Sequence, residues 1–386
     1  MKHSAMKLTM LLAAIFATAV VSQAQTTSVL TTGLTTPVKM ITAGDNSILV
    51  SEQGTAVPNT GRLSRVDRST GARETLISGL PSGVNNLGGP PAPSGPTGLN
   101  LHGHTLYLTI SGGDSTQNVS GFEFPSSSPP SSPIFASVLE LILPGGWEQL
   151  SSPFVMTLSD QTALAAGNVV ILTNADGESL SIRLVVDLPD YTPNPQPGFP
   201  NVVRSSNLFG IERFQQHLYV IDAAQNDIKR VNISDGQTSV FVAFPDRPNP
   251  LFPFGRPFIE PVPDSIHRVG NQLLVTLLTG FPFVQGLAEV QTVSLNSGEH
   301  ETLIPGLTSA IDVLALDTGY YTLEFSTNLL AQQPGRIRFY SSADAAPVLV
   351  VGGGLISPTS LARDENTGDL FVTNIFPGTI TRVSFP

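Results

Sequence analysis

One short pattern recurs six times along this chain and constrains its fold more than any other feature. Each copy has an apolar segment, a turn, and a second apolar segment whose last residue is often polar. The copies begin at Pro37, Pro96, Leu208, Pro263, Ala310 and Pro358. Repeats of roughly 40 to 50 residues are typical of propellers and solenoids, and alternating apolar and polar residues favour strands. The pattern therefore predicts an all-β, six-bladed β-propeller.

Each repeat except the last contains four segments with strand character, which predicts blades of four antiparallel strands. In the first repeat, the third and fourth segments are residues 62–66 and 74–80. The last repeat ends at Pro386 without a fourth segment, whereas residues 27–34 (TSVLTTGL) resemble the fourth segment ETLISGL of the first repeat. We therefore expect residues 27–34 to join the last blade and close the ring, since closure removes an exposed sheet edge.

The interval from 96 to 207 is about twice as long as the others. It contains a Pro/Ser-rich run, PSSSPPSSP, from Pro125 to Pro133. Such a run cannot bury an apolar face, so we interpret residues around 122–136 as an insertion in a single blade. A seven-bladed ring, in which this interval supplies two blades, is the alternative.

The first 24 residues have the pattern of a secretory signal peptide. Lys2 and Lys7 precede an apolar run from Leu8 to Val21, and small residues follow. The run is too short to span a bilayer. We predict a signal peptide over 1–24, a single propeller domain over 25–386, and a bacterial protein that is secreted or periplasmic and has no membrane span.

Composition narrows the classes of partner. The chain has a formal net charge of −11, only 13% charged residues and no cysteine. An acidic surface repels phosphate backbones, so we expect no nucleic-acid partner. Disulfides and thiolate metal sites are excluded. We expect a monomer that binds a small molecule or a protein at one face of the propeller.

Candidate ligand-binding residues lie where the second strand of a repeat ends or the first begins. Loops at these points gather on one face of a propeller, around its central channel. Oxygen-bearing side chains converging there could hydrogen-bond a polar ligand or hold Ca²⁺ or another divalent cation. Alternatively, they cap the strands and satisfy loop amides. The candidates are Glu52, Asp222, Asn226, Asp264, Asp312, Glu324 and Asn374, and the metal-ligand candidates among them are Glu52, Asp222, Glu324 and Asn374.

Familiar catalytic signatures are missing from the sequence. It has no G-x-S-x-G elbow, P-loop or G-x-G-x-x-G. His217, His267 and His300 fall near predicted turns without an evident partner, so no catalytic histidine can be assigned. His102-Gly103-His104 lies in a predicted turn on the face opposite the acidic residues, and we interpret it as a hairpin rather than a metal site.

The second half of the chain resembles the ScyD/ScyE propeller family. The resemblance lies in SNLFGI with LYVIDAAQNDIKRVN, in VPDSIHRVGNQLLVTLLTGFPFVQG, in GLTSAIDVLAL and in GGGLISPTSL with FVTN, between about Ser205 and Val383. The most distinctive phrase is TGFPF, Thr279–Phe283. The family is named after proteins encoded in scytonemin biosynthesis clusters and is related to NHL-type and gluconolactonase-like six-bladed propellers. The resemblance implies a secreted six-bladed propeller.

These observations predict a propeller that binds a ligand or partner at the channel mouth. A metal-dependent, lactonase-like hydrolase is the enzymatic alternative, with the four strand-end residues as metal ligands. An auxiliary role in a scytonemin-like secondary-metabolite pathway is a third hypothesis, which rests on the resemblance alone.

Overall fold

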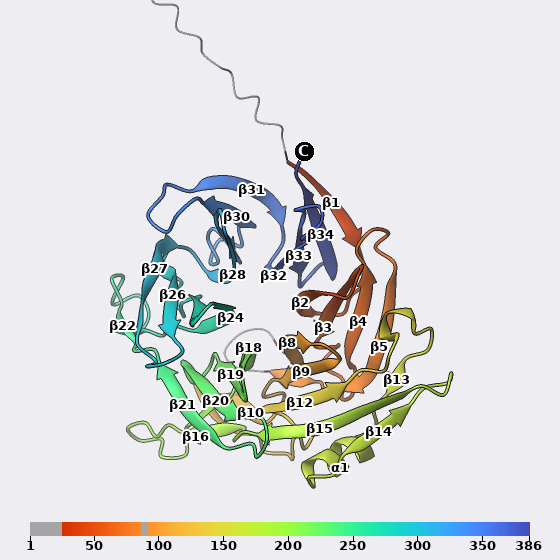
Figure 1. Cartoon of the computed structure of the whole chain (residues 1–386). Helices are drawn as coiled ribbons and strands as arrows, with labels where there is room; N and C mark the ends of the chain where they lie inside the picture. Colours follow the sequence, from red (N-terminus) through yellow and green to blue (C-terminus); the bar gives the residue numbers. More distant parts are fainter. Residues whose placement is uncertain (1–24, 86–90) are drawn as a thin grey trace, which may run out of the picture.

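A computed structural model describes residues 25–85 and 91–386. Six β-sheets are arranged in a ring around a central channel (Figure 1). The six-bladed propeller predicted from the repeats is therefore confirmed, and the residues 96–207 form one blade rather than two. The predicted signal peptide, residues 1–24, lies outside the described residues.

The repeated strands of each blade are antiparallel, and the chain passes through them from the channel outward. The innermost strands are β2 (Pro37–Ala43), β8 (Pro96–His102), β18 (Leu208–Phe214), β24 (Pro263–Val269), β28 (Ala310–Leu316) and β32 (Pro358–Arg363). The second strands are β3 (Ser47–Glu52), β9 (Thr105–Ile110), β19 (His217–Asp222), β25 (Gln272–Leu277), β29 (Gly319–Glu324) and β33 (Leu370–Asn374). The third strands are β4 (Gly61–Asp67), β12 (Ser137–Ile142), β20 (Asp227–Asn232), β26 (Ala288–Ser294), β30 (Gly335–Tyr340) and β34 (Thr379–Ser384). The fourth strands are β5 (Arg73–Leu80), β15 (Ser179–Asp187), β21 (Thr238–Ala243), β27 (His300–Leu307) and β31 (Val348–Leu355).

The N-terminal strand closes the ring, as the sequence predicts. β1 (Thr26–Thr31) pairs antiparallel with β34, so the two ends of the described chain share one blade (Figure 1). The backbone N–H of Leu34 also donates to the carbonyl of Gly378 at 3.0 Å. This pairing covers an edge of β34 that would otherwise present unpaired backbone groups.

Two blades have a fifth strand that the repeat pattern does not predict. In the second blade, β14 (Val170–Thr173) pairs with β15, and in the first, β13 (Phe154–Val155) pairs parallel with β5. Both strands belong to residues 143–178, which also contain the short helix η1 (Trp147–Gln149) and α1 (Leu158–Ala165). Phe154, Met156 and Leu164 are buried in one cluster with Ile77 of β5. Burial of these side chains holds the segment over the outer edge of the first blade.

Further connections on one side of the ring carry short two-stranded hairpins. They are β6 (Gly83–Asn85) with β7 (Ala92–Ser94), β10 (Thr116–Val119) with β11 (Phe122–Pro125), β16 (Tyr191–Pro193) with β17 (Val203–Ser205), and β22 (Arg247–Pro248) with β23 (Phe258–Ile259). The Pro/Ser-rich run begins at the end of β11 and leads toward β12.

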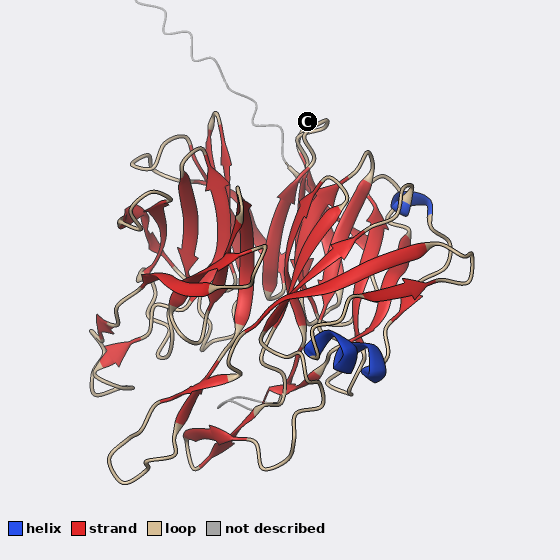
Figure 2. Ribbon diagram, turned by 60° about the horizontal axis from the view of Figure 1, so that its bottom comes forward, coloured by secondary structure: helices blue, strands red, loops and turns tan. Residues whose placement is uncertain are grey.

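The two faces of the ring differ in their connections (Figure 2). We call the loop face the one where chains enter the first strands and pass from second to third strands. The hairpin face carries the turns between first and second strands and between third and fourth strands. In the described part of the chain, no helix is long and apolar enough to span a membrane.

Every innermost strand has the same irregularity near the loop face. Its first residue pairs with the last residue of the second strand, and the register then shifts by one residue, as in a β-bulge. The third residue of each innermost strand lies within this irregularity or directly after it. These six equivalent residues line the channel, as described below.

Candidate functional site in the central channel

The strand-end residues predicted as ligands are buried and hydrogen-bonded within their own blades. Glu52, Asp222 and Glu324 have no exposed surface, and Asn374 is 2% exposed. Each side chain accepts a hydrogen bond from a backbone N–H one or two residues before the innermost strand of its blade. The donors are Thr35 for Glu52, Asn207 for Asp222, Thr308 for Glu324 and Ile356 for Asn374. These four side chains therefore tie the second strand to the loop that precedes the first.

Glu324 makes the most extensive of these interactions. Its carboxylate accepts two hydrogen bonds from the Arg336 guanidinium, at 2.9 and 2.8 Å, and forms an ion pair with Arg338. The carboxylate of Glu52 accepts from Thr35 N–H and Ser64 Oγ, and lies 4.0 Å from Arg73. Burial raises the pKa of Glu52, although these donors oppose the shift. Charge and hydrogen-bonding capacity are thus largely satisfied inside each blade.

Asn226 also accepts a hydrogen bond from the backbone just before an innermost strand, but that strand belongs to the next blade. The second strand of the fourth blade ends in Leu277, which has no side-chain acceptor. Asn226 Oδ1, from the third blade, instead accepts from the backbone N–H of Val262, at 3.1 Å. Asp222 keeps one buried oxygen, Oδ2, without a hydrogen-bond partner among the described residues, and burial raises the pKa of Asp222.

The contacts at these strand ends do not support a metal centre. The described residues contain no group of three or more His, Asp or Glu side chains that could hold a metal ion. Glu52, Asp222, Glu324 and Asn374 belong to four different blades. The calcium site expected from these four residues stays a prediction, and the contacts give it no support.

The channel wall itself holds a second set of polar residues. The third residue of each innermost strand lines a cavity of about 40 Å³, which has room for roughly three ordered waters. These residues are Lys39, Gly98, Gly210, Ser265, Asp312 and Ser360. Equivalent positions in the six blades therefore carry different side chains, so the channel is chemically asymmetric.

The two glycines of this ring allow adjacent innermost strands to approach each other. A Cβ on Gly98 would lie 2.6 Å from the carbonyl oxygen of Phe209. One on Gly210 would lie 2.8 Å from the carbonyl oxygen of Asp264. Both distances are too short for a side chain, so β8, β18 and β24 pack closely on this side of the channel.

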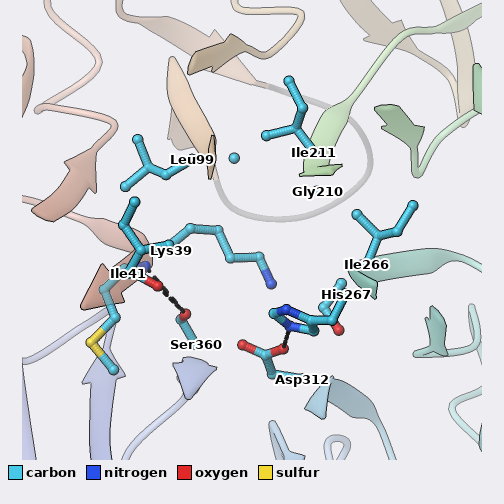
Figure 3. A pocket seen from close by; sticks show the side chains of 12 residues that line it. Lys39, Ile41, Leu99, Gly210, Ile211, Ile266, His267, Asp312 and Ser360 are labelled. Atoms are coloured by element: carbon cyan, nitrogen blue, oxygen red, sulfur yellow. Dashed lines mark hydrogen bonds and ion pairs between the residues drawn. The ribbon is translucent and has the colours of Figure 1, made fainter. Parts of the chain in front are cut away.

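Lys39 reaches across the channel from the first blade (Figure 3). Its Nζ lies 3.3 Å from Asp264 Oδ1 and 3.3 Å from the carbonyl of Thr359. The ammonium also lies 4.8 Å from the ring centroid of Phe209, a cation–π distance. Its Nζ also lies 3.5 Å from the carbonyl of Ile311, so the side chain contacts four other blades, and it is almost fully buried.

Two predicted candidates, Asp264 and Asp312, meet in this channel. Burial raises the pKa of Asp264 to about 7, although Lys39 opposes the shift. Burial also disfavours ionisation of Asp312, but Lys39 and His267 together hold the pKa of Asp312 well below its usual range. The Asp312 carboxylate further accepts from the backbone N–H groups of Leu361 and Val313, each at 2.9 Å. Asp312 is thus a stable anion next to a carboxyl that titrates near neutrality.

His267 has a partner that the sequence did not reveal. It lies in β24 rather than in a turn, and its Nε2 is 2.7 Å from Asp312 Oδ1 (Figure 3). Burial lowers the pKa of His267, but the carboxylates of Asp312 and Glu212 outweigh it and raise the pKa above its ordinary value. The side chain is 37% exposed and lines the channel cavity.

A larger, polar cavity continues along the same strands toward the hairpin face. It measures about 290 Å³ and lies between the second, third and fourth blades. Its wall includes Asn100 and His102 at the end of β8, Glu212 and Arg213 in β18, and Arg268 in β24. None of these residues is a ligand-binding candidate from the repeat pattern, because their partners lie in other blades.

Glu212 is at the centre of this wall. Burial raises the pKa of Glu212, although His267, Arg268 and the side-chain amide of Asn100 oppose the shift. Asn100 Nδ2 donates to Glu212 Oε1 at 3.3 Å. The Arg268 guanidinium lies over Phe214, 5.3 Å from the ring centroid. The cavity therefore combines a carboxyl, an amide and guanidinium groups.

Comparison with known proteins supports the propeller fold but assigns no function. No family model and no curated protein matches this sequence. A protein of unknown function from Bacteroides thetaiotaomicron has a similar structure, with a TM-score of 0.51 and 10% identity, over 94% of this chain and 76% of that one. At this identity the likeness concerns the architecture alone.

Two sugar dehydrogenases have weaker structural similarity. One is a putative glucose dehydrogenase from Thermus thermophilus, with a TM-score of 0.49 and 13% identity over 93% of this chain and 99% of that one. The other is the PQQ-bound aldose sugar dehydrogenase from Streptomyces coelicolor, with a TM-score of 0.43 and 14% identity over 93% and 98%. We transfer no activity from either protein.

Proposed function

We propose that this propeller binds a small polar molecule in its central channel, on the side of the hairpin face. The observation that carries the proposal is the 290 Å³ cavity, whose wall presents Asn100, Glu212 and Arg268. This volume lies at the lower end of the range for small-molecule sites, which use a few polar groups to orient the ligand. A ligand would enter past the turns between first and second strands.

The titratable and charged groups at the inner end of this cavity support the proposal. His267 lines the smaller cavity, directly before Arg268 of the larger one, and Glu212 contributes to raising its pKa. Lys39 and Asp312 lie deeper, in the smaller cavity. Such charges in a partly dehydrated channel interact more strongly with a bound polar molecule than they would in water. The loop-face residues have their hydrogen bonds inside the blades, so they offer fewer free groups.

Two histidines of one turn provide a matched test. His102 lines the cavity, whereas His104 does not, and both are exposed. We would screen polar small molecules for binding by saturation-transfer NMR with the unaltered protein, the His102→Trp variant and the His104→Trp control. We expect binders whose signals disappear with His102→Trp and persist with His104→Trp. Equal effects of the two variants, or no binder at all, would contradict the proposal.

We also propose that the chain is secreted or periplasmic and related to the ScyD/ScyE propellers. The phrases that carry this resemblance fall on corresponding elements of the third to sixth blades, and TGFPF joins β25 to β26 on the loop face. Expression of the full sequence in a bacterial host tests the location. We expect a product in the periplasm or medium whose mass corresponds to removal of about 24 residues, whereas a full-length cytoplasmic product would contradict secretion.

A further inference from the structure

The cavity near the hairpin face contains two guanidinium groups with no carboxylate partner. Arg213 and Arg268 both line it, and neither forms an ion pair within the described ranges 25–85 and 91–386. In contrast, most other arginines that reach the interior of a blade meet a carboxylate, as Arg336 and Arg338 do at Glu324.

Arg213 also has an unsatisfied buried atom. Its Nε is buried and has no hydrogen-bond partner among the described residues. Its guanidinium carbon lies 6.0 Å from the ring centroid of Tyr107, which supports one face of the group. The Nε itself has almost no surface that a ligand could reach. A buried donor without an acceptor costs stability, so this position is unfavourable unless the rest of the guanidinium gains a favourable partner.

Glu212 forms no ion pair with either arginine among the described residues, although the charge of Arg268 acts on its carboxyl. Its side chain accepts a hydrogen bond from Asn100, and burial raises its pKa. Arg268 contributes its backbone N–H to Glu212, while its side chain lies over Phe214. The guanidinium of Arg268 is thus positioned by an aromatic ring and by the carbonyl of Gly270, to which it donates at 2.9 Å, and remains exposed to the cavity. The local balance favours a negatively charged ligand.

We propose that the ligand is a small hydroxylated carboxylate, whose carboxylate group binds Arg213 and Arg268 and whose hydroxyl groups reach Glu212 and Asn100. This inference rests on the proposed function, because it names the ligand class of the same cavity. A guanidinium presents paired N–H donors that match the two oxygens of a carboxylate. A carboxyl next to an amide can both donate to and accept from hydroxyl groups.

The test uses two sugars that differ at a single carbon. Glucuronate carries a carboxylate where glucose has a hydroxymethyl group, so charge is the main difference between them. We would measure both by isothermal titration calorimetry at pH 7 and low ionic strength. We expect glucuronate to bind at least about tenfold more tightly than glucose, since charge-assisted hydrogen bonds are stronger than neutral ones. This comparison needs no substitution and is independent of folding defects.

Substitutions of single arginines then test which side chain binds the carboxylate of glucuronate. Arg268→Gln should weaken glucuronate binding by about tenfold or more. Arg230→Gln is the control, because Arg230 is exposed in the third strand of the neighbouring third blade and lies outside the cavity; it should change affinity by less than about twofold. Thermal unfolding of each variant confirms that it is folded.

Several outcomes would overturn the assignment. They are equal binding of glucose and glucuronate, no binding of glucuronate, or equal effects of the two arginine variants. Inorganic phosphate that binds as tightly as glucuronate would indicate a general anion site and would also overturn it. If neutral compounds still bind and lose binding only with His102→Trp, the channel remains a ligand site and only the carboxylate assignment fails.

Discussion

The strand-end residues and the channel residues differ in how they vary from blade to blade. Four of six second strands end in a side chain with an acceptor oxygen, and all four bind the backbone just before the first strand. The third residues of the innermost strands, by contrast, include a lysine, an aspartate, two glycines and two serines. Residues that accept the same backbone hydrogen bond in several blades stabilise the repeated fold. Positions whose side chains differ from blade to blade are candidates for a binding site.

The fifth residues of the innermost strands sharpen this contrast. Three adjacent blades place Asn100, Glu212 and His267 there, whereas the other three place the apolar residues Ile41, Leu314 and Ala362. Polar groups are therefore concentrated on one side of the channel, where the larger cavity lies. In a ring of similar blades, this uneven distribution of polar side chains indicates where a ligand can bind.

Removing a strand-end carboxylate should produce the largest loss of stability. In Glu324→Ala, Arg336 and Arg338 lose their partner and the N–H of Thr308 loses its acceptor. Breaking a buried ion pair from one side costs about 3 to 5 kcal/mol. Urea unfolding measures this cost. Glu365→Ala is the control, because Glu365 is 76% exposed and should change stability by less than about 0.5 kcal/mol. A small effect of Glu324→Ala would mean that the strand ends are not structural.

The channel residue Asp264 should instead affect how the stability of the protein depends on pH. The pKa of Asp264 is about 7 in the folded protein, well above its usual value near 3.8. Between these two pH values the folded state binds more protons than the unfolded state, so this group makes stability fall as pH rises. Above about pH 7 its unfavourable contribution is constant.

Asp264→Asn should remove this part of the pH dependence. Lys39, next to Asp264, and Asp312 nearby remain in the variant, so the comparison isolates one carboxyl. We expect the free energy of unfolding of the unaltered protein to fall more between pH 5 and pH 8 than that of the variant. Denaturation curves at both pH values measure the difference. Parallel pH profiles would show that Asp264 ionises normally.

The sequence predicted the blades because their determinants are local. Alternation and turn residues are patterns of neighbouring positions, and the match between residues 27–34 and ETLISGL predicted the ring closure through β1, which is confirmed. The fifth strand β13 was missed because it has only two residues and lies outside the repeated pattern. The fold was therefore mostly predictable from patterns within this one sequence.

The site was less predictable because its contacts join different blades. Asp264 and Asp312 were selected from their positions in the repeat, and the structure brings them together. Lys39 and His267 were not selected, since their partners are 225 and 45 residues away in the sequence. The ring of third residues could have been found by aligning the six innermost strands and asking which column varies most in charge.

Calcium should have the smallest effect on this protein. Ca²⁺ requires six to eight oxygen ligands, and the strand-end carboxylates Glu52 and Glu324 already accept hydrogen bonds and ion pairs inside their blades. A ligand that binds only the folded state raises its stability according to its concentration and affinity. We therefore expect the midpoint of thermal unfolding to be the same in millimolar CaCl₂ and in EDTA, with NaCl at matched ionic strength as the control. An increase specific to calcium, abolished in Asp222→Asn, would show that the unpaired Oδ2 of Asp222 belongs to a cation site, and would make the strand ends functional as well as structural.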